Sequence, residues 1–262
     1  MEIVRTNRVE VAYQREGDGP PIVLVHGATS DSRMWQPQLA ALADEFTVAA
    51  WDEPGAGQSS DVPPDFGLAD YADCLAAVID DIGLGPAHVA GLSWGGTVAL
   101  ELYRRHPGLV ASLILADTYA GWKGSLPAEE VEARIQGVRQ AVAAPAGSFD
   151  PTLPGLFAGD PPAEFVPLLE AVGRDVRSAS MKTALTVMAE ADLCGVLPQV
   201  AVPTLLIWGE FDARSPLYVA EQFEQAISGS KLTIIEGSGH VSNLERPEEF
   251  NEAVRKFVRA NR

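Results

Sequence analysis

The sequence contains little cysteine and lacks the usual metal-binding motifs. Only Cys74 and Cys194 occur in 262 residues, so we expect no disulfide framework and interpret both as buried thiols. Neither an H-E-x-x-H nor a C-x-x-C motif is present. We therefore expect no metal ion and no other cofactor.

Positive charge is also scarce. The chain has 19 Lys and Arg against 36 Asp and Glu, a formal net charge of −17. Binding to nucleic acid or to an anionic membrane needs clustered basic residues, so we expect neither partner. No apolar run approaches the roughly 20 residues that span a bilayer, and the first residues do not resemble a secretion signal. These absences predict a cytoplasmic protein, and they leave its oligomeric state open.

A glycine-flanked serine stands where an apolar strand is predicted to turn into a helix. Ser93 lies between Gly91 and Gly95 in a G-x-S-x-G pattern, after the apolar residues 87–92 and before the helical run 97–106. Such a turn is tight, so the two glycines are predicted to supply space that a Cβ would fill. Ser93 itself is predicted to have a strained backbone, with its Oγ presented above the sheet. This arrangement is typical of a nucleophilic serine.

Two possible partners of that serine also follow predicted strands. Asp212 comes after the apolar run 203–208, and His240 comes after the run 231–236. Since the carboxyl ends of parallel strands meet at one edge of a sheet, the three side chains are expected to lie together. A serine hydroxyl needs an imidazole to take its proton, and the imidazole needs a carboxylate to fix its tautomer. Ser93, His240 and Asp212 are thus candidates for nucleophile, base and orienting acid.

Other residues compete for two of these roles. Asp117 also ends a strand at the same predicted edge and is the main alternative to Asp212. Among the remaining histidines, His106 falls in the last turn of a helix and His88 within a strand. His26 follows a strand but precedes the serine, and we interpret it as a residue that shapes a loop.

These motifs together resemble the α/β-hydrolase family. The resemblance is to its compact, lid-bearing members, such as 3-oxoadipate enol-lactonase, bacterial esterases and cofactor-free haloperoxidases, and it covers nearly the whole chain. The matching segments, in the family's order, are residues 26–27 with Trp35, 52–59, 91–96, 209–212 and 239–250. This set is specific for the superfamily but not for a substrate.

The resemblance implies a serine hydrolase. It would cleave an ester, lactone or related acyl bond of a small, largely apolar substrate through an acyl-enzyme on Ser93. The backbone N–H groups of Ala28 and Trp94 would form the oxyanion hole. Relatives often carry an arginine between Asp52 and Gly55, where this chain has proline at position 54, so the role of that arginine is not carried over.

Other activities are compatible with the same motifs. The triad could serve carbon–carbon bond hydrolysis, perhydrolysis or a biosynthetic tailoring step, and the fold could serve a ligand receptor with little turnover. Dehalogenase and epoxide-hydrolase relatives need a carboxylate at position 93, so the serine argues against them. The glycines at 55 and 57 lack the third glycine of a dinucleotide-binding fingerprint, which argues against an oxidoreductase.

The order of the predicted elements favours the α/β class. Strands are predicted near residues 9–14, 22–25, 46–51, 87–92, 111–117, 203–208 and 231–236, and helices near 32–42, 68–82, 97–106 and 247–259. With the resemblance, this implies a mainly parallel, eight-stranded sheet with helices on both faces. The first two strands are predicted to form a hairpin, which would give the sheet an antiparallel edge.

The rhythm of strands and helices changes after residue 119. No strand is predicted from 120 to 197, whereas helices are predicted near 128–143, 163–172 and 178–193. We interpret residues 1–119 and 198–262 as the core domain and 120–197 as a helical cap, or lid, over Ser93. The candidates to line a pocket beneath the lid, each of which could instead pack in the core, are Trp122, Phe149, Leu153, Phe157, Phe165, Met181 and Met188.

Overall fold

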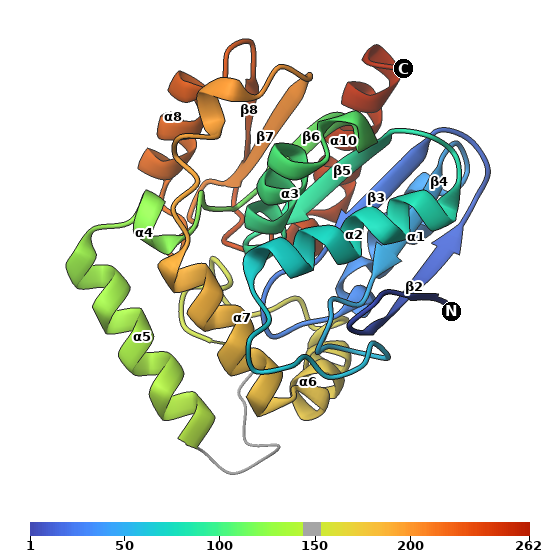
Figure 1. Ribbon diagram of the computed structural model, residues 1–262. Coiled ribbons are helices and arrows are strands. Elements are labelled where there is room, and N and C mark those ends of the chain that lie inside the picture. Colours follow the sequence, from blue (N-terminus) through green and yellow to red (C-terminus); the bar gives the residue numbers. More distant parts are fainter. Residues whose placement is uncertain (144–152) are drawn as a thin grey trace.

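The computed structural model describes residues 1–143 and 153–262, and its centre is a sheet of eight strands (Figure 1). The strands are β1 (Glu2–Arg5), β2 (Glu10–Glu16), β3 (Pro21–Val25), β4 (Thr47–Trp51), β5 (Ala87–Leu92), β6 (Val110–Ala116), β7 (Thr204–Gly209) and β8 (Lys231–Ile235). Their order across the sheet is β1-β2-β4-β3-β5-β6-β7-β8. This confirms the mainly parallel sheet, because every pair from β4 to β8 is parallel.

The antiparallel edge is confirmed, but the pairing predicted for it was wrong. Strand β2 pairs with β1 on one side and with β4 on the other, so β4 lies between β2 and β3. The connection from β2 to β3 crosses the start of β4, where the N–H of Thr47 donates to the carbonyl oxygen of Pro20 (3.2 Å). A Cβ on Gly17 would lie 2.2 Å from the carbonyl oxygen of Phe46, so glycine permits this close crossing. The connection is as short as a hairpin loop, which is why the sequence suggested one.

Helices cover both faces of the sheet. Outside residues 120–197 they are α1 (Gln36–Leu42), α2 (Leu68–Ile82), α3 (Trp94–Arg105), α8 (Leu217–Ala226), α9 (Ser242–Glu245) and α10 (Pro247–Ala260). Short 3-10 helices span Ser32–Trp35, Pro107–Leu109 and Leu197–Gln199. Helices α2, α3 and α8 pack on one face, and α1 and α10 pack on the other.

The alternation of side chains along β3 explains the two layers. Val23 and Val25 belong to the apolar cluster that includes α2 and α3, whereas Ile22 and Leu24 belong to the cluster that includes α1 and α10. All four side chains are fully buried. A strand covered on both faces has an almost continuous apolar sequence, which is why β3 was readily predicted.

Residues 120–197, here called the inserted segment, connect β6 to β7. The segment contains α4 (Trp122–Ser125), α5 (Ala128–Ala143), α6 (Val166–Asp175) and α7 (Ser178–Glu190), and its described residues contain no strand. Figure 1 shows α5, α6 and α7 gathered at one edge of the sheet. The predicted bounds match α5, whereas α6 begins three residues later than predicted.

Within residues 1–143 and 153–262, no helix has both the length and the apolar character needed to cross a bilayer.

Candidate active site

Ser93 sits on the sharp turn between β5 and α3. Its φ of 54° lies in the left-handed region, which confirms the strained conformation predicted for it. A Cβ on Gly91 would lie 2.5 Å from the backbone of Gly95, and a Cβ on Gly95 would lie 2.1 Å from the carbonyl oxygen of Val25. The predicted need for glycine at both positions is therefore confirmed.

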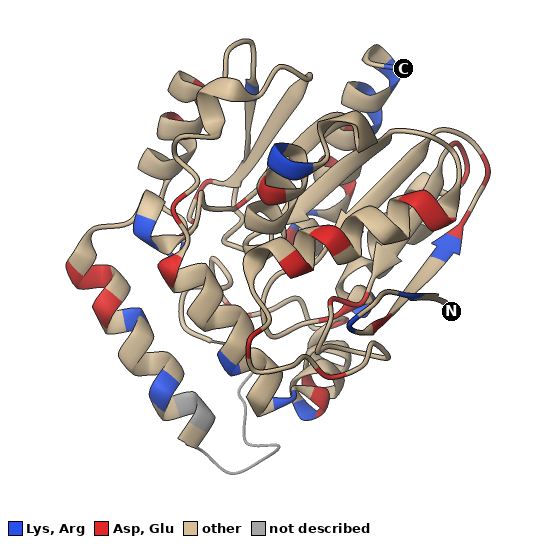
Figure 2. Ribbon diagram, in the orientation of Figure 1, with Lys and Arg blue, Asp and Glu red and all other residues tan. Residues whose placement is uncertain are grey.

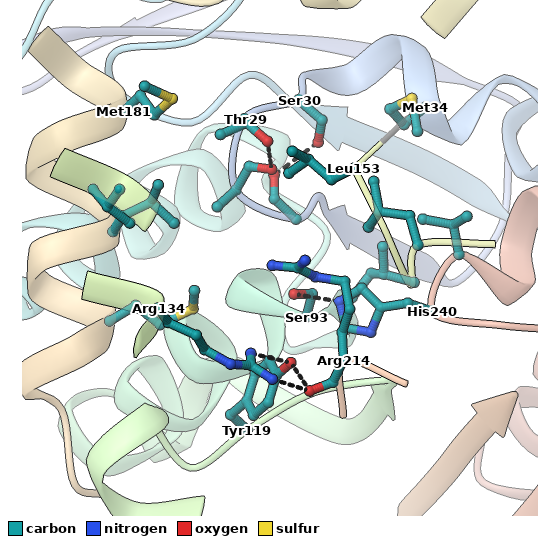
Figure 3. Close-up of a pocket in the computed structure, with 18 of the residues that line it drawn as sticks. Thr29, Ser30, Met34, Ser93, Tyr119, Arg134, Leu153, Met181, Arg214 and His240 are labelled. Atoms are coloured by element: carbon teal, nitrogen blue, oxygen red, sulfur yellow. Dashed lines mark hydrogen bonds between the residues drawn. The ribbon is translucent and has the colours of Figure 1, made fainter. Parts of the chain in front are cut away.

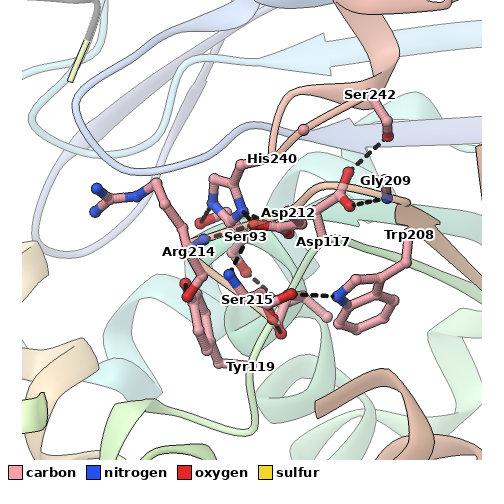
Figure 4. A network of polar contacts seen from close by, with 12 residues as sticks. Ser93, Asp117, Tyr119, Trp208, Gly209, Asp212, Arg214, Ser215, His240 and Ser242 are labelled. Atoms are coloured by element: carbon pink, nitrogen blue, oxygen red, sulfur yellow. Dashed lines mark hydrogen bonds and ion pairs between the residues drawn. The ribbon is translucent and has the colours of Figure 1, made fainter. Parts of the chain in front are cut away.

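Ser93, His240 and Asp212 form one chain of hydrogen bonds (Figure 4). The Oγ of Ser93 lies 2.9 Å from Nε2 of His240, and Nδ1 of His240 lies 2.9 Å from Oδ2 of Asp212. All three residues are buried, with exposed fractions of 8%, 2% and 5% for Ser93, His240 and Asp212. The structure thus brings together the three residues that the sequence selected from the ends of β5, β7 and β8.

The backbone holds the carboxylate of Asp212 in a fixed orientation. Its Oδ1 accepts hydrogen bonds from the N–H groups of Arg214 and Ser215, both at 2.8 Å. The second oxygen, Oδ2, is thereby directed at the imidazole of His240. Both donors belong to the turn that follows β7, so the strand end positions the acid and its partner together.

Asp117, the alternative acid, has other partners. Its Oδ1 accepts from the N–H of Gly209 (2.8 Å) and its Oδ2 from the hydroxyl of Ser242 (2.6 Å), as Figure 4 shows. Complete burial and the nearby charge of Asp212 raise the pKa of Asp117 well above its ordinary value. No hydrogen bond joins Asp117 to His240 among the described residues. The geometry therefore favours Asp212.

The other histidines are engaged elsewhere. Nε2 of His26 accepts from the N–H of Glu53 (3.0 Å), which leaves Nδ1–H to donate to the carbonyl oxygen of Gly27 (2.8 Å). Burial lowers the pKa of His26, in keeping with this neutral tautomer. These contacts confirm His26 as a loop-shaping residue. His88 pairs with the Ser112 hydroxyl in the sheet, and His106 pairs with an aspartate on α2.

Two backbone N–H groups are available beside Ser93. Trp94 is the first residue of α3, so its N–H has no acceptor within the helix, and it lies at the positive end of the helix dipole. Ala28 belongs to the loop after β3, and this loop lies close to Ser93: a Cβ on the neighbouring Gly27 would lie 3.5 Å from the Cβ of Ser93. Among the described residues, no hydrogen bond is found from the N–H of Trp94 or of Ala28. Both predicted oxyanion donors are therefore free for a ligand.

A cavity of about 290 Å³ opens above Ser93 and His240 (Figure 3). Its apolar lining comes from the core loops and the inserted segment and includes Met34, Leu92, Trp122, Val138, Leu153, Leu156, Leu169, Val172, Met181, Leu185, Met188 and Val241. Of the predicted lining residues, Trp122, Leu153, Met181 and Met188 do line it. Phe157 and Phe165 do not, and they pack instead against an apolar cluster that includes the lining residue Met34, whereas Phe149 lies outside the described residues.

Two charged lining residues were missed by the sequence analysis. Arg134 of α5 and Arg214 of the turn after β7 both face the cavity. Neither belongs to a motif of the family resemblance. The available signal was the place of Arg214, a basic residue two positions after the candidate acid Asp212 in a strongly acidic chain. No group of three or more potential metal ligands is found among the residues that the structure describes.

The sequence analysis also missed a buried glutamate that contacts the residue directly after Ser93. The carboxylate of Glu53 accepts a hydrogen bond from the indole Nε1 of Trp94 (2.5 Å). Burial, helped by the charge of Asp52, raises the pKa of Glu53 to about 8. Pro54 is buried in the same loop.

Replacing Glu53 with glutamine is expected to stabilise the fold at high pH. The pKa of about 8 exceeds the ordinary 4.5, so the folded state keeps a proton that the unfolded state loses. The contribution of Glu53 to the stability of the wild type therefore falls as the pH rises from about 4.5 to 8, by at most roughly 5 kcal/mol. Glutamine has no such proton, and its carbonyl oxygen can still accept from Trp94.

The free energy of unfolding, measured in urea from pH 5 to pH 9, tests this expectation. The advantage of Glu53→Gln over the wild type should grow across that range. Glu221→Gln, at an exposed position on α8, is the control and should follow the wild-type curve. Parallel curves for Glu53→Gln and the wild type would show that Glu53 ionises normally in the fold.

Comparison with known proteins agrees with this geometry. The family model described as the alpha/beta hydrolase family matches residues 22–253. Among curated relatives, 3-oxoadipate enol-lactonase 1 of Acinetobacter baylyi is 29% identical, over 98% of this chain and 97% of its own. A pimeloyl-acyl-carrier-protein methyl ester esterase of Neisseria meningitidis is 30% identical, over 94% of this chain and 97% of its own.

Solved structures give the same result. A thermophilic esterase from Thermogutta terrifontis superposes with a TM-score of 0.84 at 30% identity, covering 99% of both chains. The enol-lactonase from Burkholderia xenovorans superposes with a TM-score of 0.79 at 27% identity, covering 98% of this chain and 99% of its own. The sequence match, the sheet and the serine turn agree: this chain belongs to the alpha/beta hydrolase family.

Proposed function

We propose that this chain hydrolyses a carboxylic ester or lactone of a small molecule through an acyl-enzyme on Ser93. Ester or lactone hydrolysis as the reaction class rests on the family and on the relatives named esterase and enol-lactonase. The observation that carries the acyl-enzyme is the hydrogen-bonded chain from Asp212 through His240 to Ser93 at the base of the cavity.

The first half-reaction forms the acyl-enzyme. Oγ of Ser93 attacks the substrate carbonyl carbon while Nε2 of His240 accepts the hydroxyl proton, and Asp212 stabilises the imidazolium that results. The negative charge that develops on the carbonyl oxygen is held by the N–H groups of Ala28 and Trp94. Removing one such donor costs about 3 to 4 kcal/mol in comparable enzymes, so their placement matters as much as that of the side chains.

The acyl-enzyme is complete when the first tetrahedral intermediate collapses and the bond from its carbon to the leaving oxygen breaks. His240 gives its proton to that oxygen, which departs as an alcohol from an ester or stays attached to the acyl group of a lactone. The second half-reaction releases the acid. A water molecule then attacks the acyl carbon while His240 takes one of its protons. Collapse of this second intermediate breaks the bond to Ser93 and restores its hydroxyl.

The inserted segment is proposed to act as the lid of this site. Its residues Trp122, Val138, Leu169, Met181 and Met188 supply much of the apolar lining. A cover of this kind limits the access of bulk water to the site and strengthens the hydrogen bonds to the oxyanion. We accordingly propose residues 120–197 as the cap and residues 1–119 and 198–262 as the catalytic core, with a small, largely apolar substrate between them.

Covalent labelling tests the nucleophile. A fluorophosphonate should add one adduct per chain, detected by mass spectrometry of the intact protein and mapped to the peptide that contains Ser93. The adduct should be absent from Ser93→Ala and present in Ser228→Ala, a control at an exposed position. Folded protein that remains unlabelled and hydrolyses no p-nitrophenyl ester or lactone would contradict the proposed function.

A further inference from the structure

The cavity above Ser93 differs from the rest of the chain in its charge. Acidic residues number 36 in the sequence and are spread along helices such as α2 and α5 (Figure 2). None of the described residues that line the cavity is an aspartate or glutamate, whereas Arg134 and Arg214 both line it. In a chain with a net charge of −17, the substrate cavity is therefore locally cationic.

The charge of Arg134 is already compensated. Its guanidinium pairs with Glu130 at 2.7 Å and donates to the hydroxyl of Tyr119 at 2.9 Å. It also lies over the rings of Tyr119 and Trp122, with centroid distances of 5.4 and 5.3 Å. Arg134 thus serves mainly to fasten α5 beside the site.

Within residues 1–143 and 153–262, the guanidinium of Arg214 has no such partner. Among the described residues, its side chain makes one hydrogen bond, a long one of 3.5 Å to the carbonyl oxygen of Pro154, and no ion pair. Figure 3 shows that it extends into the cavity above Ser93, with no dashed line to another residue drawn. Burial lowers the pKa of Arg214, yet a guanidinium remains charged at neutral pH. Among the described residues, the cavity therefore contains a half-buried cation without a counter-ion.

Hydrogen bonds of its main chain fix the position of Arg214. The N–H of Arg214 donates to Asp212 at 2.8 Å, and its carbonyl oxygen accepts from the hydroxyl of Tyr119 at 2.6 Å and from Arg134 at 2.5 Å. The residue is consequently tied to the same turn that orients the triad acid. A group bound by its guanidinium would be held in a fixed relation to His240 and Ser93.

We propose that Arg214 binds an ionised carboxylate of the substrate, so that the enzyme acts on esters or lactones that carry a second, free carboxylate. This inference rests on the proposed function and adds the substrate class. The planar guanidinium can form a bidentate ion pair with a carboxylate, through two parallel N–H···O hydrogen bonds. Such an ion pair is stronger where water is excluded. Since Arg214 has no counter-ion in the part of the chain that the structure describes, it can balance one negative charge, which favours a carboxylate over a phosphate dianion. The apolar lining would hold the carbon chain between the two ends.

A purely structural role for Arg214 makes a different prediction. Arg214 contacts the loop at Pro154, and a Cβ on Gly155 would lie 3.5 Å from its Cγ. If support of that loop were its only role, its loss would lower activity toward charged and neutral substrates by the same factor. The ratio of the two activities therefore separates a binding role from a structural one.

The test compares p-nitrophenyl monoesters of succinate, glutarate, adipate and pimelate with neutral p-nitrophenyl esters of the same lengths. Arg214→Met should lower kcat/KM for the preferred charged ester by about 30- to 100-fold, mainly through KM, and should change kcat/KM for the neutral esters less than threefold. Arg214→Lys should restore part of the preference. Arg174→Met, at an exposed arginine of α6, is the control and should leave the ratio unchanged.

If Arg214→Met left the ratio of kcat/KM for charged and neutral esters unchanged, the proposal would be overturned. A preference for p-nitrophenyl esters that carry a phosphate instead would also overturn it.

Binding without turnover separates this inference from the proposed function. Calorimetry with Ser93→Ala and the monomethyl esters of the same diacids should detect binding that is lost when Arg214→Met is added. Such binding would support the role of Arg214 even if no substrate were hydrolysed. Hydrolysis of neutral esters only would support the proposed function and contradict the role of Arg214.

Discussion

Replacing Ser93 with alanine is expected to lower kcat for ester hydrolysis by about 10⁴- to 10⁶-fold. The Oγ that lies 2.9 Å from Nε2 of His240 is the proposed attacking atom, so without it no acyl-enzyme can form. The residual rate would come from direct attack by water on a substrate whose carbonyl oxygen is held by the N–H groups of Ala28 and Trp94. Steady-state hydrolysis of a p-nitrophenyl ester by the purified variant, with its fold checked by circular dichroism, measures the loss.

The double variant sharpens this expectation. His240→Ala should cost about as much as Ser93→Ala, and the two together should cost little more than either one, because residues that act as a unit lose their effect together. Ser228→Ala, on the exposed turn after α8, is the matched control and should retain the wild-type rate. If Ser93→Ala kept more than about a hundredth of the wild-type kcat, another nucleophile would have to be sought.

The parallel part of the fold could be predicted because its strands carry a clear signal. Strands buried on both faces, such as β3 and β5, are nearly continuous apolar runs, and the helices between them have amphipathic or apolar patterns. Edge strand β1 (Glu2–Arg5) was missed, since it has only four residues and three of their side chains are exposed. The partner of β2 was mistaken because the short loop 17–20 fits a hairpin, whereas the insertion of β4 is settled only by tertiary packing.

The site could be predicted where it depends on strand ends. Ser93, Asp212 and His240 each follow a strand, and the parallel sheet brings strand ends to one edge, so their meeting follows from topology. Glu53 and Arg214 could not be found in this way, because their surroundings are built by residues distant in the sequence. The pKa of Glu53 depends on burial behind Trp94, and the importance of Arg214 depends on the absence of an acid from the described cavity lining.

Changing Asp212 to asparagine is expected to lower kcat by about 10³- to 10⁴-fold while leaving the fold intact. Oδ1 accepts two backbone N–H groups, so the asparagine oxygen should take that position and its NH₂ should replace Oδ2. The NH₂ would then donate to Nδ1 of His240, 2.9 Å away, and place the imidazole proton on Nε2. In that tautomer Nε2 faces the Ser93 hydroxyl without a free lone pair, and it cannot accept the proton. Measurement of kcat, beside fluorophosphonate labelling rates, gives the size of the loss.

Asp117→Asn provides the matched comparison, since it makes the same chemical change at the buried carboxylate beside Asp212. Its Oδ1 would still accept from the N–H of Gly209, and its NH₂ would donate to the hydroxyl of Ser242, which can rotate to accept. We therefore expect kcat to fall less than tenfold, because no hydrogen bond to His240 is altered. The reverse pattern, a large loss for Asp117→Asn and a small one for Asp212→Asn, would assign the orienting acid to the end of β6. The pair of variants thus decides between two buried carboxyl groups that follow the neighbouring strands β6 and β7.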